Sequence, residues 1–237
     1  MFIKSIIKPA LFTAVLSMGM LSCDSDDKTI IKPNGSENGH EFVELGLKVK
    51  WATYNVGATK PWEYGNYYAW GETEIKATYD WSTYKWWNDS SSTLTKYNTN
   101  SSNGTIDNKN TLDPGDDVAH VKWGGNWRMP TWEELEELIN SCTWIWYNSG
   151  NTEFNGVAGY KVTSKKSGYT DRSIFLPAAE CRGDMLQYRE GSYGSYWSSS
   201  LRTNNPDFSW HLLFYSDYPI THCNYRGGGL SVRPVCP

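Results

Sequence analysis

The side chains that could act as nucleophiles or metal ligands do not form a recognisable catalytic or metal-binding pattern. Three consecutive serines, Ser198 to Ser200, are candidate nucleophiles, but a serine attacks only beside an activating base, and the sequence identifies none. His211, His222 and Cys223 lack the spacing of a zinc site. The motifs G-x-S-x-G and H-E-x-x-H and the P-loop do not occur. We therefore predict no catalytic residue, no metal and no cofactor.

Carboxylates are concentrated in the stretch PTWEELEELINSC, where four glutamates could be read as catalytic acids. Acids in the first two turns of a helix also favour the helix dipole, and we adopt this structural interpretation. Thr131 can cap the helix while Glu134 reaches back to it, as in a capping box. Apolar side chains recur at spacings of three and four residues: Leu135, Leu138, Ile139 and Cys142. This pattern predicts one amphipathic helix near residues 131–142.

The N-terminus has the charged-then-apolar order of a secretory signal. Lys4 and Lys8 precede a dozen mostly apolar residues, too few to span a bilayer, and Ser22 and Cys23 follow. Cys23 resembles the cysteine of a bacterial lipobox, whose thiol is acylated, for example with palmitate, and before which the chain is then cut. The acidic DSDDK that follows looks like the surface-export tag of Bacteroides-type lipoproteins. We predict a signal peptide over 1–22 and a lipid-anchored protein exposed on the outer membrane; an ordinary secretory signal is the alternative.

Four further cysteines could form disulfides in an exported chain. Cys142, Cys181, Cys223 and Cys236 allow three pairings, which the sequence does not rank. We hypothesise that Cys236 is bonded to the interior, because such a bond would fix the last strand and restrict the unfolded chain.

Composition excludes one class of partner and leaves the role of the aromatic residues open. The net charge of −4 over 237 residues provides no basic surface for nucleic acid. Thirteen Trp and sixteen Tyr suit a binding surface and a ring-filled core equally well.

The rest of the chain is organised into a tether and one folded domain. Residues 23–40 are polar and contain Pro33 and two glycines, which predicts a flexible tether followed by a domain over 41–237. Apolar alternation predicts short strands in FVELGLKVKWATYNVG, NYYAWGE, GYKVTS, SIFLPAA, YWSSSL, WHLLFY and LSVRPV. Residues 73–117 have no clear period but contain several tryptophans, and we expect a surface excursion pinned by aromatic side chains. Many short strands with one good helix predict an α+β fold with mostly antiparallel strands.

Three regions together resemble one known family. They are LGLKVKWATYNVGA with PWEYGNYYAWGE, then DDVAHVKWGGNWRMPTWEELEELI, then SIFLPAA, GSYGSYWSSSL and GLSVRPV. They resemble the Fibrobacter succinogenes major paralogous domain, related in fold to C-type lectins and formylglycine-generating enzymes. The resemblance runs from about Glu41 to Cys236 and implies a C-type-lectin-like domain. Tyr54 stands where many relatives have cysteine, and no counterpart of the copper-binding cysteines of the oxidase branch can be placed. A fold alone does not assign an activity.

The resemblance also suggests a variable surface near the C-terminus. Some proteins of this fold diversify, through retroelements, a segment that precedes a motif similar to GLSVRPV. By this likeness the changeable positions would be His211, Leu213, Tyr215, Tyr218, Thr221, Cys223 and Tyr225. Trp210, Leu212 and Phe214 would then form the scaffold, because alternate residues of a strand face opposite sides. The glycines at 227–229 permit a tight turn with positive φ, after which Leu230, Val232 and Val235 would anchor the chain.

These observations predict a surface lipoprotein that binds a protein or glycan ligand through its C-terminal face. The predicted ligand-binding residues are His211, Leu213, Tyr215, Asp217, Tyr218, Thr221, Asn224, Tyr225 and Arg226. One alternative is a structural or adhesive subunit of an outer-membrane assembly. Another is a carbohydrate-active enzyme with a cleft lined by the Trp-rich stretch 79–97, which would need two carboxylates such as Asp80 and Asp89 at a set separation. In an inert structural domain, residues 210–226 would be an ordinary strand and loop.

Overall fold

The computed structural model describes residues 31–91, 93–183 and 191–237, and the expected signal peptide and Cys23 lie outside these ranges. Within the described ranges the chain forms small sheets whose neighbouring strands are all antiparallel, with few helices. This confirms the expected α+β class with mostly antiparallel strands. No helix of this part of the chain is long and apolar enough to cross a membrane.

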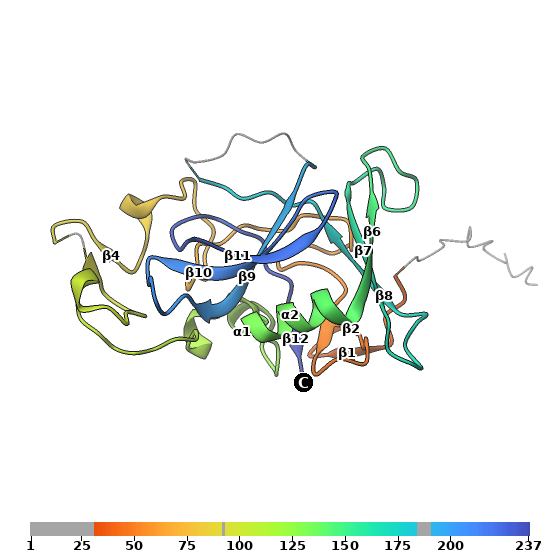
Figure 1. Cartoon of the computed structure of the whole chain (residues 1–237), viewed down its shortest axis with the longest axis horizontal. Helices are drawn as coiled ribbons and strands as arrows, with labels where there is room; N and C mark the ends of the chain where they lie inside the picture. Colours follow the sequence, from red (N-terminus) through yellow and green to blue (C-terminus); the bar gives the residue numbers. More distant parts are fainter. Residues whose placement is uncertain (1–30, 92, 184–190) are drawn as a thin grey trace, which may run out of the picture.

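One sheet joins the two ends of the domain. Its strand order is β1-β2-β3-β12, with bounds Gly35–Glu37, His40–Val43, Lys50–Ala52 and Val235–Cys236. Figure 1 shows the C-terminus beside β1 and β2. The folded part therefore begins before the expected residue 41, and Ile31 is already only 2% exposed. Asn38 and Gly39 both have positive φ, and an Asn-Gly pair in this conformation makes a tight hairpin turn.

The central sheet, which contains most of the predicted ligand-binding residues, has the order β11-β10-β9. These strands span Pro219–Tyr225, Phe208–Phe214 and Gly194–Leu201. The strand β10 is paired on both sides, whereas β11 is an edge strand with β10 as its neighbour. A second three-stranded sheet, β6-β7-β8, spans Cys142–Tyr147, Gly159–Ser164 and Ser173–Pro177.

The predicted amphipathic helix is α2, Trp132–Ser141, and its capping box between Thr131 and Glu134 is present. Glu134 also forms an ion pair with Arg128, 2.6 Å from carboxylate oxygen to guanidinium nitrogen. The helix packs against β6 and all three strands of the central sheet. A second, short helix, α1 at Val118–Trp123, was not expected and is capped by the Asp117 carboxylate.

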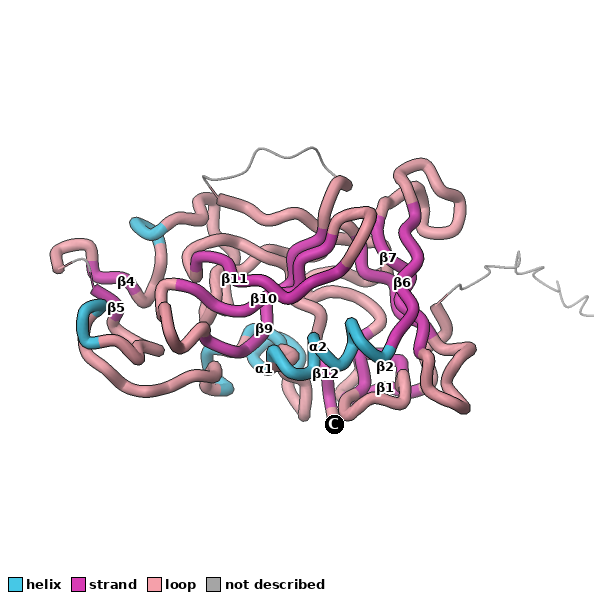
Figure 2. The backbone as a smooth tube through the Cα atoms, in the orientation of Figure 1, coloured by secondary structure: helices cyan, strands magenta, loops and turns pink. Residues whose placement is uncertain are grey.

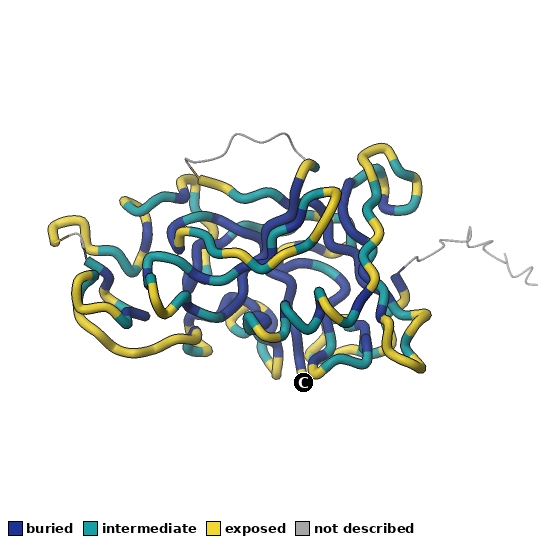
Figure 3. Tube along the Cα trace, in the orientation of Figure 1, coloured by how far each residue is buried: buried dark blue, intermediate teal, exposed yellow. Residues whose placement is uncertain are grey.

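Residues 73–117, which we call the Trp-rich excursion, extend to one side of the central sheet, around β4 and β5 (Trp87–Asn88 and Thr93–Leu94; Figure 2). Much of its surface is exposed (Figure 3), but the rings of Tyr79, Tyr84 and Tyr97 are buried. The expectation of a surface excursion pinned by aromatic side chains is therefore confirmed.

The final segment is held by close backbone packing rather than by a continuous strand. Leu230 bridges Tyr68, Ser231 bridges Tyr196, and only Val235–Cys236 forms a strand. The expected strand in NYYAWGE is likewise reduced to the bridge at Tyr68. None of the glycines at 227–229 has positive φ, so the prediction that they are needed for a turn with positive φ was wrong. A Cβ atom at Gly229 would lie 2.7 Å from the Tyr79 ring, so this glycine is required by close approach.

Candidate functional site

The C-terminal hairpin combines a buried strand with a displayed one. The strand β10 is largely buried, whereas every residue of β11 is exposed or half-buried. Tyr218, Ile220 and Tyr225 are 50%, 41% and 36% exposed, and they are three of the seven large apolar or aromatic side chains that are exposed in the described part of the chain. A strand fixed along one edge and open on its surface is suited to contact a partner. We call residues 213–225 of this hairpin the C-terminal face, although adjacent cross-strand pairs such as Leu212–Thr221 and Leu213–Ile220 place its side chains on both sides of the two strands.

The structure brings seven of the nine predicted ligand-binding residues to this face. Those exposed or half-buried are Leu213, Tyr215, Asp217, Tyr218, Thr221, Asn224 and Tyr225. The other two, His211 and Arg226, are buried, and their prediction as ligand contacts was wrong. Leu212 and Phe214 are buried as expected of scaffold residues, whereas Trp210 is half-buried and stacks on Trp132 of α2.

His211 is buried because it lies in the middle strand of the sheet. It is paired with Trp197 on one side and His222 on the other, and it is 3% exposed. The Ser195 hydroxyl lies 2.8 Å from His211 Nδ1, while Nε2 has no hydrogen-bond partner among the described atoms. Burial, with a smaller contribution from His222, lowers the pKa of His211 to about 3. The imidazole is therefore uncharged at neutral pH.

This burial makes the stability of the protein depend on pH. Between about pH 3 and 6.5 the unfolded chain protonates His211 whereas the folded chain does not, so acid favours unfolding. We expect the protonation of His211 in the unfolded chain to lower the free energy of unfolding by up to about 1.4 kcal/mol for each unit by which the pH falls in this range. Urea titrations from pH 4 to 8 should show a shallower pH dependence for His211→Gln than for the wild type. His222→Gln is the control: it removes only the smaller contribution to the lowered pKa of His211, so it should keep most of the wild-type slope. Parallel curves for the wild type and His211→Gln would contradict the assignment.

Arg226 is buried because its guanidinium connects the hairpin to the Trp-rich excursion. It donates hydrogen bonds of 2.9–3.1 Å to four oxygens: Tyr84 Oη and the carbonyls of Lys96, Tyr97 and Pro206. It also lies 4.9 Å from the Trp70 ring and 5.2 Å from the Tyr84 ring. Four of the five N–H groups of the guanidinium are thus bonded inside the protein, and Arg226 acts as a structural anchor.

The polar groups of the C-terminal face differ in their freedom to bind a ligand. The Thr221 hydroxyl donates to the Glu136 carboxylate and accepts from Trp132 Nε1, so it is committed to α2. Asn224 Oδ1 accepts a hydrogen bond from the backbone N–H of Tyr225 at 2.8 Å. The two N–H groups of the Asn224 side-chain amide take no part in this bond. Asp217 is exposed at the turn between β10 and β11. Asp217 and Asn224 are therefore the polar side chains best placed for a ligand.

Tyr225 belongs to a group of rings that the sequence alone did not bring together. Its centroid lies 4.2 Å from that of Phe208 and 6.1 Å from that of Trp81, and Trp81 lies 5.0 Å from Trp87. All four rings are at least partly accessible. The Trp-rich excursion thus extends the C-terminal face with further aromatic surface.

The candidate catalytic groups are engaged in structural hydrogen bonds. The Asp80 carboxylate accepts from Ser82 Oγ and the Thr83 N–H. Ser198 Oγ donates to the Trp210 carbonyl and Ser199 Oγ to the Pro130 carbonyl. No three His, Cys, Asp or Glu residues in the described ranges could together hold a metal ion.

The four cysteines of the described chain are free thiols. The hypothesis of a disulfide from Cys236 was therefore wrong. Burial of Cys236 and pairing of β12 with β3 hold the terminus instead, and burial raises the pKa of this thiol. Cys223 is half-buried on β11, where Arg202 Nη1 donates to its sulfur at 3.0 Å.

No known protein family, curated protein or solved structure matches the chain.

Proposed function

We propose that the chain is a surface-exposed lipoprotein with a C-type-lectin-like domain that binds a protein or glycan ligand through its C-terminal face. The observation that carries the proposal is that Ile220 and Tyr225 are exposed on the edge strand β11 and that Tyr218 is exposed in the turn directly before it. Rings provide contact and stacking area at small entropic cost, and Asp217 and Asn224 add directional hydrogen bonds. The order of the N-terminal residues supports acylation at Cys23 and an outer-membrane location.

The C-type-lectin-like assignment rests on the sequence resemblance and is compatible with the arrangement of the strands. Both ends of the domain enter one small sheet, and the displayed hairpin precedes the closing GLSVRPV segment. Retroelement diversification of Leu213, Tyr215, Tyr218, Thr221, Cys223 and Tyr225 would make this face variable. A neighbouring reverse transcriptase and a near-repeat of the coding end would support this part of the proposal.

A second candidate function is a structural or adhesive subunit of an outer-membrane assembly. The specific observation in its favour is that β11 is an edge strand, so its outer backbone groups could pair with a strand of another subunit. Such pairing depends on the backbone, whereas ligand recognition by rings depends on the side chains.

The triple variant Tyr215→Ala, Tyr218→Ala and Tyr225→Ala tests ligand recognition directly. We expect it to abolish retention of the intact chain's ligand on glycan and host-protein arrays. The loss of partial packing of Tyr215 on Tyr193 and of Tyr225 on Phe208 should lower the free energy of unfolding by only about 1–2 kcal/mol.

The control for the triple variant is Ile106→Ala with Val121→Ala, which removes exposed apolar side chains elsewhere. This control should bind as the wild type does. Unchanged retention by the triple variant would contradict recognition through the rings. Loss of folding would instead place the rings in the core.

A further inference from the structure

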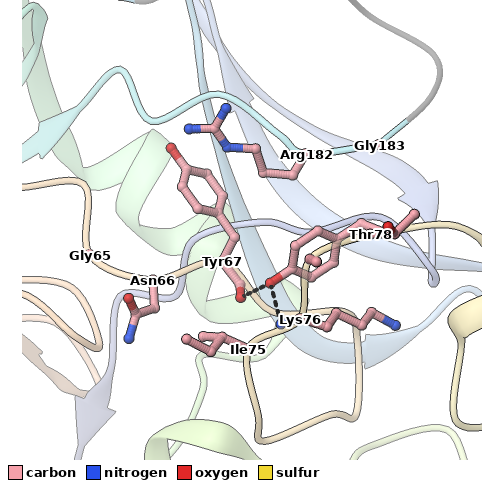
Figure 4. A pocket seen from close by; sticks show the side chains of 10 residues that line it. Gly65, Asn66, Tyr67, Ile75, Lys76, Thr78, Arg182 and Gly183 are labelled. Carbon is pink, nitrogen blue, oxygen red and sulfur yellow. Dashed lines mark hydrogen bonds between the residues drawn. The ribbon is translucent and has the colours of Figure 1, made fainter.

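A separate cleft of about 560 Å³ is lined by residues 65–67, 75–79 and 182–183 (Figure 4). Its lining includes Asn66, Tyr67, Ile75, Lys76, Tyr79 and Arg182. Pockets of 300 to about 1,000 Å³ are typical of small-molecule sites. The cleft therefore has room for a ligand of one or two rings.

Arg182 is a positioned cation in this cleft. Its backbone is fixed by two hydrogen bonds of 2.7 Å with Gly229, one in each direction. Its guanidinium lies 4.7 Å from the centroid of the Tyr67 ring and is hydrogen-bonded to the Tyr67 hydroxyl. Figure 4 shows the two side chains next to each other. Within residues 31–91, 93–183 and 191–237, Arg182 forms no ion pair, and its side chain is exposed. A planar guanidinium held in this way is suited to bind a carboxylate with two parallel hydrogen bonds.

The charges around the cleft favour an anion. Lys76 is the other cation of the lining, and its ammonium is already bonded to the Glu72 carboxylate and the Thr83 carbonyl, each at 3.0 Å. Among the described residues, none of those that line the cleft is acidic, although Glu180 is close enough to Tyr67 to contribute to its raised pKa. Arg182 is thus available for a negatively charged ligand although the chain as a whole carries a net charge of −4.

The remaining lining groups suit a sugar ring. The Asn66 amide and the Thr78 hydroxyl each supply a hydrogen-bond donor and a hydrogen-bond acceptor. The Tyr67 hydroxyl is protonated at neutral pH, as an ordinary tyrosine is, and burial raises its pKa further, to about 12. Ile75, which is 61% exposed, and the Tyr67 ring supply apolar surface. Sugars present hydroxyl groups and C–H faces together, which matches this mixture better than a purely apolar ligand would.

We propose that this cleft binds the carboxylate of an acidic sugar of the hexuronic-acid type, with Arg182 as its anchor. The site is distinct from the C-terminal face and does not depend on the function proposed for that face. It accounts for the exposed Ile75 and for the Arg182 guanidinium, which forms no ion pair within the described residues.

Calorimetric titration of the intact chain with D-glucuronate and D-glucose tests the carboxylate requirement. We expect glucuronate to bind at least about tenfold more tightly than glucose, because charge-assisted hydrogen bonds to Arg182 are absent with the neutral sugar. Equal affinity for the two sugars, or no binding of glucuronate, would overturn the proposal. A peptide with a free C-terminal carboxylate that bound more tightly than glucuronate would also overturn it, by assigning the cleft to protein termini.

Arg182→Gln should weaken glucuronate binding at least about tenfold while leaving the melting temperature unchanged, because the side chain is exposed. The matched control is Arg172→Gln. Arg172 stacks on Tyr169 at 4.6 Å, as Arg182 does on Tyr67, but it is paired with Glu44 outside the cleft. Full glucuronate affinity in Arg182→Gln, or equal loss in both variants, would refute the anchor. The triple tyrosine variant of the C-terminal face should bind glucuronate normally, which separates the two proposals.

Discussion

Arg226→Met is expected to lower the free energy of unfolding by about 3–5 kcal/mol. Methionine preserves much of the length and apolar packing of arginine but cannot donate a hydrogen bond. Four oxygens that accept from the guanidinium would be left without this donor inside the protein, each at a cost of about 1 kcal/mol. Urea unfolding followed by tryptophan fluorescence measures the loss.

The effect of Arg226→Met should be concentrated in the Trp-rich excursion. Two of the four acceptors are carbonyls of Lys96 and Tyr97, so hydrogen exchange should increase most over residues 79–97. The control is Arg202→Met, which removes a half-buried guanidinium near Phe208 and Cys223 and should cost less than about 1 kcal/mol. Equal stability of the two variants would show that Arg226 does not anchor the excursion.

Arg233→Met is expected to lower the free energy of unfolding by a similar amount but to affect different parts of the fold. Its buried guanidinium donates to Asn55 Oδ1 and to the carbonyls of Ala52, Thr53 and Phe175 at 2.8–3.2 Å. These acceptors belong to β3, the turn after it, and β8, so the arginine joins the last segment to its own sheet and to the β6-β7-β8 sheet. We expect a loss of about 3–5 kcal/mol in the free energy of unfolding.

Hydrogen exchange distinguishes the role of Arg233 from that of Arg226. Arg233→Met should raise exchange in β3, β8 and β12 together, because the anchor ties these strands to one another. An increase confined to residues 79–97 would contradict this role. Burial lowers the pKa of Arg233 to about 10, so the guanidinium remains charged at neutral pH, where the comparison should be made.

Local features of the fold were predictable because neighbouring residues determine them. The capping box of Thr131 and Glu134 and the spacing of Leu135 and Leu138 specify α2 without reference to the rest of the chain. The Asn38-Gly39 turn also had a local signal, which our interpretation of residues 23–40 as tether overlooked.

The site was predictable only in part because burial depends on distant contacts. Alternation along β10 correctly assigned Leu212 and Phe214 to the interior, but it assumed that the opposite side of the strand is open. Trp197 of β9 contributes to the burial of His211, and this pairing is not encoded within β10. Arg226 similarly reaches carbonyls about 130 positions earlier in the chain.

The unequal accessibility of the four cysteines in the described part of the chain provides a way to label the protein. Cys142 and Cys236 are closed to solvent, whereas Cys181 and Cys223 are half-buried. Cys181 is adjacent to Arg182 in the sequence, and Cys223 lies on β11. Maleimide dyes therefore have one native attachment point beside each proposed surface, and single-cysteine versions of the chain would let fluorescence follow occupancy of the two surfaces separately.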